Sequence, residues 1–85
     1  MVQEKVLIKL KNGLQSRQAA FFVQVASRFA SEICIGDGNK KLNAKSIIGV
    51  MSLAVRSGAE VIISAKGSDA MDAVKSLKQL VSKEG

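Results

Sequence analysis

The sequence predicts an α+β fold in the order βαββαβα, with its helices packed on one face of a sheet. Two observations lead to this prediction. Segments of alternating or β-branched apolar residues come between longer segments with a helical period. Turn signals such as Asn12-Gly13 and Ser57-Gly58 end several of these segments. Helices that are apolar on one side need a sheet to cover, so both kinds of element belong to one layered unit.

The N-terminal segments predict a strand followed by a helix. In residues 2–10, Val6, Ile8 and Leu10 alternate with lysines, which is typical of a strand with one face in water. Ser16 can then cap a helix over about residues 17–29. The apolar stripe of this helix comprises Ala19, Phe22, Val23, Ala26 and Phe29.

The middle of the chain predicts a hairpin and a short helix. Residues 32–35 and 40–43 have the composition of short strands, and Asp37-Gly38 between them is a hairpin turn signal. Ser46 then begins a helix that runs to about Val55. The Ser57-Gly58 pair beyond it is a stop signal for that helix.

The C-terminal segments predict one more strand and one more helix. Residues 60–66 contain three consecutive β-branched residues and form the strand. Ser68 or Asp69 can cap the final helix, and Gly85 stands at its end. The expected apolar stripe of this helix comprises Met71, Val74, Leu77 and Val81.

The helix that begins at Ser46 has more apolar residues than one buried face needs. At about 100° per residue, its two apolar sides are separate. One side holds Gly49, Val50, Leu53 and Ala54, and the other holds Ile47, Ile48, Met51 and Val55. The first helix has a similar excess in Ala20, Phe21 and Val25. Packing under neighbouring loops would explain either excess alone, but the two together favour an exposed protein interface.

Length and composition restrict the class of protein. The chain has 85 residues, which predicts a single domain over residues 1–85. Its N-terminal segment is too polar for a signal peptide or a membrane span, and the single Cys34 cannot form an internal disulfide. These features favour a cytoplasmic protein without a membrane partner. The net charge of +6 suggests an acidic partner. The charges are spread along the chain, with only Lys40 and Lys41 adjacent, so an ordinary mixed surface explains them as well.

The residue types that catalysis usually requires are scarce. The chain has no histidine, which is the commonest general base and the commonest zinc ligand. One cysteine and seven scattered carboxylates make no metal cluster, and there is no glycine-rich phosphate loop. We therefore expect no catalytic residues, no metal site and no cofactor, and a protein that is not an enzyme.

Ser46 has two interpretations. As a plain helix N-cap it is worth about 1 kcal/mol. As a phosphorylation site it would carry about −1.5 to −2 charges at the free N–H groups of the helix start, beside the apolar residues described above. The residues around it do not decide between the two.

Three segments of the chain resemble a known family. GLQSRQAAFFVQVASRF, NAKSIIGVMSL and SGAEVIISAKG, in this spacing, are similar to the phosphocarrier protein HPr of the bacterial sugar phosphotransferase system. The resemblance extends over nearly the full length, and NxKSIxGVMSL is its most specific part. It implies an HPr-like open-faced β-sandwich, in which a four-stranded antiparallel sheet has three helices on one face.

The resemblance also implies a function without phosphotransfer. Gln15 stands where HPr has its phosphocarrier histidine, and this change is typical of the catabolite-repression paralogues in Gram-positive bacteria. By resemblance, Ser46 is phosphorylated by the ATP-dependent HPr kinase/phosphorylase. The phosphorylated form is then a corepressor that binds the catabolite control protein, a LacI-type transcription regulator, and reaches DNA only through it.

The same resemblance implies which residues bind partners. They are Gln15, Arg17, Ala20, Phe21, Gln24, Lys45, Ile47, Ile48 and Met51. Gln18 departs from the family, which usually has proline there, and this change should cost some order in the first turn of the helix. We expect a monomer or a weak homodimer, and Asn12-Gly13 offers a hinge for exchange of the first strand.

Two other functions remain open alternatives. A small basic nucleic-acid-binding α+β domain would explain the net charge, but the three phenylalanines all fall in one helix, whereas base stacking needs aromatic residues among basic ones on strands. Phosphocarrier activity like that of HPr is the other alternative, and the absence of histidine argues strongly against it.

Overall fold

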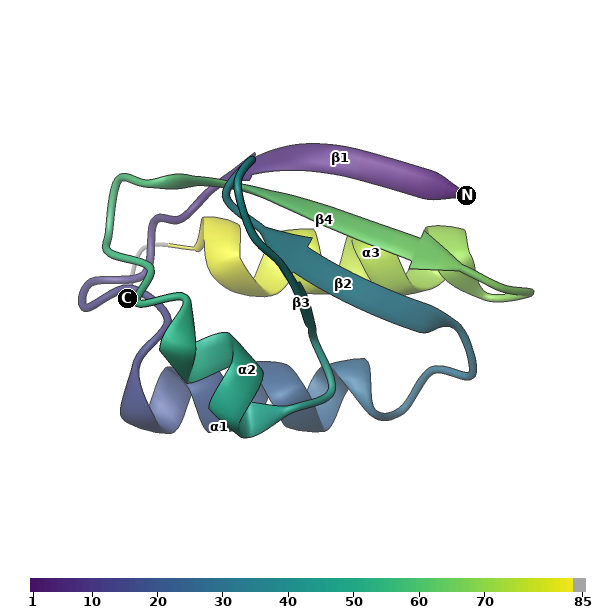
Figure 1. Ribbon diagram of the computed structural model, residues 1–85, viewed down its shortest axis with the longest axis horizontal. Coiled ribbons are helices and arrows are strands. Elements are labelled where there is room, and N and C mark those ends of the chain that lie inside the picture. The colour runs from purple at the N-terminus through teal and green to yellow at the C-terminus, as the bar shows by residue number, and fades with distance from the viewer. Residues whose placement is uncertain (84–85) are drawn as a thin grey trace.

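The computed structural model describes residues 1–83 and has three helices on one face of a four-stranded antiparallel sheet (Figure 1). The elements are β1 (Val2–Leu7), α1 (Ser16–Ala26), β2 (Glu32–Gly36), β3 (Lys41–Asn43), α2 (Ile47–Ser52), β4 (Glu60–Lys66) and α3 (Ala70–Ser82). The strand order across the sheet is β1-β4-β2-β3, and every neighbouring pair is antiparallel. The predicted fold class and element order are confirmed.

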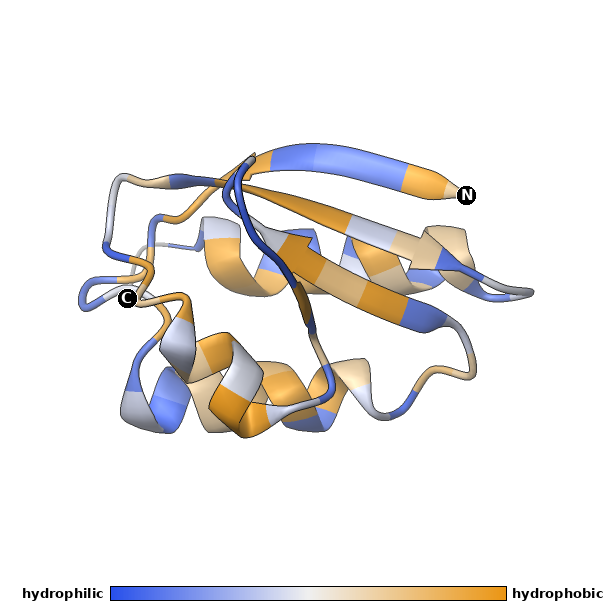
Figure 2. Ribbon diagram, viewed as in Figure 1, coloured by the Kyte–Doolittle hydropathy of each residue, from blue (hydrophilic) through white to orange (hydrophobic). Residues whose placement is uncertain are grey.

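The core lies between the helices and the sheet. Figure 2 shows that β2 and β4 consist mostly of apolar residues and that apolar residues recur along the three helices. Phe22 of α1, Ile35 and Ile63 of the central strands, and Leu77 of α3 are all fully buried there. Only two polar residues, Ser31 and Ser64, are buried among the described residues. No helix within residues 1–83 is long and apolar enough to cross a membrane.

The first strand is shorter than its alternating pattern predicted. β1 ends at Leu7, yet Ile8 and Leu10 are still buried in the core. The backbone leaves the ladder there, because the N–H of Ile8 bonds to Ala59 O at 2.8 Å and that of Lys9 bonds to Val81 O at 2.8 Å. The alternation of buried and exposed residues therefore continues past Leu7, the last paired residue of β1.

Helix α1 differs from the prediction at both ends. Gln15 occupies the N-cap position with an extended backbone, and its side chain makes no capping hydrogen bond. Ser16 is already the first helical residue and has a φ of +48°, so the prediction that Ser16 caps the helix is wrong. The helix ends at Ala26, and Phe29, expected within it, lies partly buried in the turn that follows.

Helix α2 ends three residues earlier than predicted. Its last residue is Ser52, and Ala54 has a φ of +52°, outside the right-handed helical region. This change of direction turns Val55 into the core, although the helical projection grouped it with Ile48. The grouping of Val55 with the exposed residues is therefore wrong.

Helix α3 begins as predicted, and its predicted stripe is correct except for one residue. Asp69 is at the N-cap position, but its side chain does not cap the helix. Met71 is 70% exposed, so its assignment to the core stripe is wrong. The prediction is confirmed for Val74, Leu77 and Val81, and Ala70 and Ala73 complete the buried side. The expected helix end at Gly85 lies outside the described residues.

Candidate functional site

Ser46 begins the short helix α2 and caps it. Its hydroxyl accepts a hydrogen bond from the N–H of Gly49 at 3.2 Å, and its carbonyl accepts one from Val50 at 2.9 Å. The residue has extended backbone angles, as an N-cap requires. The capping role predicted for Ser46 is confirmed. The side chain is half-buried, and the first N–H groups of the helix lie beside it without helical partners.

Asn43 holds the segment that precedes Ser46, a role that the sequence analysis did not assign. Its carboxamide oxygen accepts the N–H of Lys45 at 2.9 Å, and its carbonyl accepts the N–H of Ser46 at 3.1 Å. Asparagine commonly forms such a turn with the residue two positions later, so the pair Asn43 and Lys45 was a usable signal. Helix α2 also lies close to Asn43, because a Cβ added to Gly49 would be 3.3 Å from Asn43 O.

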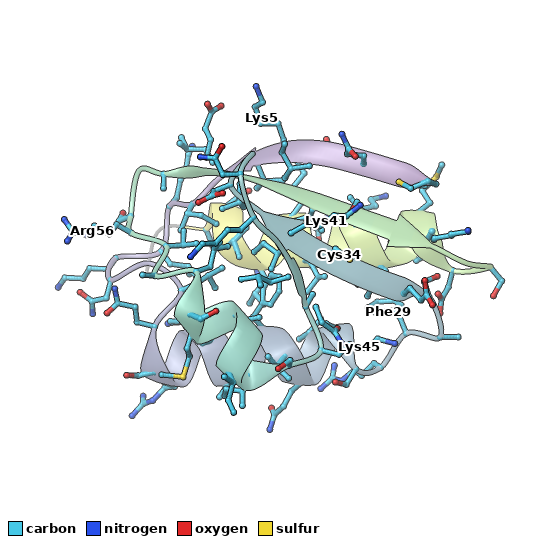
Figure 3. All side chains as sticks on the ribbon, viewed as in Figure 1. Lys5, Phe29, Cys34, Lys41, Lys45 and Arg56 are labelled. Carbon is cyan, nitrogen blue, oxygen red and sulfur yellow. The ribbon has the colours of Figure 1, made fainter. Side chains whose placement is uncertain are left out.

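Lys45 connects α2 to the end of α1. Its Nζ donates a hydrogen bond to the carbonyl oxygen of Phe29 at 2.7 Å, in a partly buried place. Figure 3 shows the two residues close together where α1 leads into β2. The ammonium group predicted to bind a partner is thus already bonded within the chain.

The surplus apolar residues of α1 and α2 are at the surface. Phe21, Ile47, Ile48 and Met51 are 45%, 40%, 79% and 46% exposed, and we call these four residues the α1–α2 patch. The two helices that carry them are in contact. The predicted excess on these helices is confirmed for the four residues of the patch, whereas Val25 and Ala20 are only partly exposed.

The other predicted site residues of α1 surround a shallow depression next to the patch. Arg17, Ala20, Phe21 and Gln24 line it together with Gln18. Gln15, directly before the helix, is exposed to solvent. The structure thus places the predicted α1 residues on one exposed side of the helix.

Ser46 and Gln15 lie at opposite ends of the α1–α2 pair. The start of α2 is joined to the end of α1 through Lys45 and Phe29. At the other end, the N–H of Leu14 bonds to Val55 O at 3.0 Å, just beyond α2. The eleven residues of α1 span about 16 Å at about 1.5 Å per residue. The two positions with family-specific chemistry are therefore not adjacent.

The described residues offer little for catalysis or metal binding. No group of three cysteine, aspartate or glutamate side chains within residues 1–83 could hold a metal ion. Cys34 is half-exposed on β2 and is a free cysteine.

Comparison with known proteins agrees with the resemblance found in the sequence. A family model described as the phosphotransferase-system HPr component phosphorylation site matches residues 2–83. The chain belongs to the HPr family. A curated relative, the HPr-like protein Crh of Bacillus subtilis, is 51% identical over 84 residues, which cover 99% of each chain. The predicted relation to Crh, the catabolite-repression HPr, is thereby confirmed.

Solved structures of HPr and Crh share the fold. HPr-C-His from Thermoanaerobacter tengcongensis superposes with a TM-score of 0.92 and 49% identity, and the match covers 95% of this chain and 91% of that one. Crh from Bacillus subtilis, described as a dimer with a swapped domain, has a TM-score of 0.79 and 50% identity, and that match covers 100% and 98% of the chains. The chain thus has the HPr fold.

The chain nevertheless departs from a phosphocarrier at the start of α1. It contains no histidine, and Gln15 occupies the N-cap position of that helix. Gln18, where a proline was expected, has a backbone N–H that bonds to Gln15 O at 3.0 Å. The helix therefore forms its first turn with Gln18 in place of the proline.

Proposed function

We propose that the chain is a cytoplasmic, non-catalytic regulator of carbon catabolite repression that is switched by phosphorylation of Ser46. HPr kinase/phosphorylase would add the phosphate, using ATP. The phosphorylated form would then bind a LacI-type catabolite control protein as a corepressor, and would reach DNA only through that regulator. The observation that carries the proposal is the position of Ser46, at a helix start beside an exposed apolar patch.

The surroundings of Ser46 suit a phosphate. The unpaired N–H groups at the start of α2 would donate to its oxygens, and the Lys45 ammonium lies in the adjacent residue. The helix is already formed and capped, so the modification needs no refolding of the segment. What changes is the charge at the border of the α1–α2 patch, where a partner's arginine or lysine could pair with the new dianion.

The α1–α2 patch supplies the apolar part of the proposed interface. Ile48 projects furthest, at 79% exposure, and Met51 is an adaptable side chain suited to a protein contact. Arg17 and Gln24 border the same side of α1. An interface with an apolar centre and a polar border of this kind is typical of protein recognition.

The lack of histidine supports a role separate from sugar phosphotransfer. A carboxamide such as that of Gln15 does not form the phosphorylated intermediate that a phosphocarrier needs. The HPr surface would thus be retained for recognition alone. We also propose that the chain is a monomer or a weak homodimer. The swapped dimer described for Crh from Bacillus subtilis supports a dimer.

Nucleic-acid binding by the chain itself is not favoured by the structure. Phe22 is buried, Phe29 is partly buried in a turn, and the exposed Phe21 lies on α1. The strands of the sheet carry no aromatic side chain for bases to stack on.

The deciding experiment is phosphorylation followed by a binding titration. The chain is incubated with HPr kinase/phosphorylase and ATP, and its intact mass is compared with that of Ser46→Ala. One added phosphate, absent in the variant, and binding of only the phosphorylated form to the regulator are the expected results. A phosphate that persists in Ser46→Ala, or equal binding of both forms, would overturn the proposal.

A further inference from the structure

The face of the sheet that no helix covers carries a groove along its two central strands. Strand registers place Gly36 opposite Ile62 and Cys34 opposite Ser64 on this face, and both pairs lie in the middle of the sheet. The flanking strands carry longer side chains in the same rows, with Lys5 beside Ile62 and Lys41 beside Gly36. Three of the four central residues, Cys34, Gly36 and Ser64, are small, and longer side chains flank them. The face is therefore hollowed into a trough, which we call the open-face groove.

Two adjoining hollows make up the open-face groove. One lies among Gln3, Gly36, Lys41, Ile62 and Ser64, and the other continues past Cys34 to Lys66. Lys41 and Ser64 line both hollows. Ser64 is a polar residue that is only 5% exposed. The floor of the groove therefore offers a polar group alongside the apolar Ile62.

The charges around the open-face groove are mostly positive and unpaired. Lys5, Lys40, Lys41 and Lys66 surround it, and all four are exposed. Among residues 1–83 the one ion pair joins Lys78 and Glu4, so none of the four has a carboxylate partner. Glu32 lines the second hollow and stands opposite Lys66, without an ion pair between them, and Glu60 lies at the start of β4. Asp37 in the hairpin is occupied by the N–H groups of Asn39 and Lys40, each at 3.0 Å.

The shape of the groove favours a polypeptide over a small molecule. The two hollows measure about 190 and 80 Å³, below the roughly 300–1,000 Å³ of pockets that enclose small ligands. The seven residues of β4, however, give the face a length of about 20 Å at about 3.3 Å per residue. An extended segment of about six residues has that length.

We propose that the open-face groove is a docking site for an extended acidic segment of a partner protein. Glutamate or aspartate side chains of the segment would lie between Lys5 on one side and Lys41 on the other, while alternate apolar side chains fill the small-residue floor. A second copy of this chain is disfavoured, because two positive faces would repel each other. Nucleic acid is disfavoured because the face has no aromatic side chain.

The proposed site is independent of the α1–α2 patch. The helices cover the opposite face of the sheet, as Figure 1 shows, and Figure 3 shows Lys5 extending away from them. A partner on the open face would leave Ser46 accessible. The two proposals can therefore fail separately: a result against regulator binding does not contradict peptide binding in the groove, and a result against peptide binding does not contradict regulator binding.

The test uses a fluorescent peptide of about eight residues in which glutamate and valine alternate, with a glutamine-for-glutamate peptide as its control. Fluorescence anisotropy measures binding to the full chain. The double variant Lys5→Glu/Lys41→Glu is compared with Lys11→Glu/Lys75→Glu, which has the same net charge but alters residues outside the groove. We expect about tenfold or greater weakening in the first variant and less than about twofold in the second.

Cys34 provides a second readout inside the groove. Bound peptide should slow alkylation of its thiol by iodoacetamide at least about threefold, and Ile48→Asp, which alters only the α1–α2 patch, should leave this protection unchanged. Thermal unfolding of each variant checks that it folds. Equal weakening in the two double variants, unprotected Cys34, or no binding at millimolar peptide would overturn the proposal. Single-stranded DNA of the same charge serves as a further probe. If it binds as tightly as the peptide and protects Cys34 equally, the partner of the groove is a nucleic acid and the proposal of a protein partner is wrong.

Discussion

Asp69 at the start of α3 accepts a hydrogen bond from the backbone N–H of Ser31, 38 residues away, at 2.9 Å. The same carboxylate accepts the N–H of Ala30 at 2.9 Å and the hydroxyl of Ser31. Gly67 lies so close that a Cβ there would approach Ser31 Cα to 2.8 Å. These contacts join the start of α3 to the segment that leads into β2.

The first prediction concerns the pH dependence of this contact. The Ser31 hydroxyl and the Ala30 N–H hold the pKa of Asp69 below its ordinary value. Its contribution to the free energy of unfolding is therefore complete above the unfolded-state pKa and is lost as the pH falls through the lower folded-state pKa. Asp69→Ala should unfold more easily in urea than wild type at neutral pH, and the difference should shrink below about pH 4.

Asp37→Asn is the comparison for that prediction. The pKa of Asp37 is also lowered, by the N–H groups of Lys40 and Asn39, but these partners lie within three residues of it. Loss of a local turn contact should destabilise the fold less than loss of a contact between distant segments. Equal destabilisation by the two variants, or a pH-independent effect of Asp69→Ala, would contradict this interpretation.

Ser46 should be replaceable by another capping residue without loss of stability. Ser46→Ala removes the acceptor of the Gly49 N–H and should lower the free energy of unfolding by about 1 kcal/mol. Aspartate caps as well as serine does, so Ser46→Asp should remain within about 0.5 kcal/mol of wild type. Urea unfolding measures both. A Ser46→Asp protein as unstable as Ser46→Ala would mean that the hydroxyl has a role other than capping.

The α1–α2 patch should matter for binding and not for stability. Ile48→Ala removes a side chain that is 79% exposed and should change stability by less than about 0.5 kcal/mol. It should nevertheless weaken binding of the Ser46-phosphorylated form to the regulator by about tenfold or more. Met71→Ala, equally exposed but on α3, is the matched control and should bind normally. Isothermal titration calorimetry would compare them, and similar affinities would argue against the patch as the interface.

A histidine at position 15 tests the reason for the absent phosphotransfer. The backbone around Gln15 already has the extended N-cap conformation, and the side chain is exposed. Gln15→His should therefore gain an acid-labile phosphate from phosphoenolpyruvate and the phosphotransferase enzyme, whereas the wild-type chain gains none. If the variant stays unphosphorylated while it remains folded, then Ser16, Gln18 or another neighbour also prevents the transfer.

The order of elements could be predicted from the sequence because periodicity and turn residues are local. Helix ends were less predictable, since they depend on contacts. Ser16 looked like a cap, but the chain reaches it with a positive φ. Met71 had the spacing of a core residue, but in the first turn of α3 the sheet buries Ala70 and Ala73 instead. Which residue of a terminal turn is buried depends on how the helix end is rotated against the sheet.

The candidate site was predictable in composition but not in arrangement. The excess of apolar residues on two helices correctly indicated the exposed Phe21, Ile48 and Met51. Spacing alone could not show that Lys45 is bonded to Phe29 O, or that Gln15 and Ser46 occupy opposite ends of the helix pair. Both facts depend on how α2 returns along α1, which involves residues distant in the sequence.

The N-cap of α2 is already formed by Ser46, and this determines how phosphorylation of that residue could be recognised. The Ser46 hydroxyl already accepts the Gly49 N–H, so the phosphorylated and unphosphorylated forms would have the same backbone conformation. A binding partner would then distinguish them by electrostatic potential alone. Discrimination between the two states should then fade as ionic strength rises, because mobile ions screen exposed charges beyond about 8–10 Å. Binding through the apolar side chains would persist under those conditions, but it would no longer report the state of the switch.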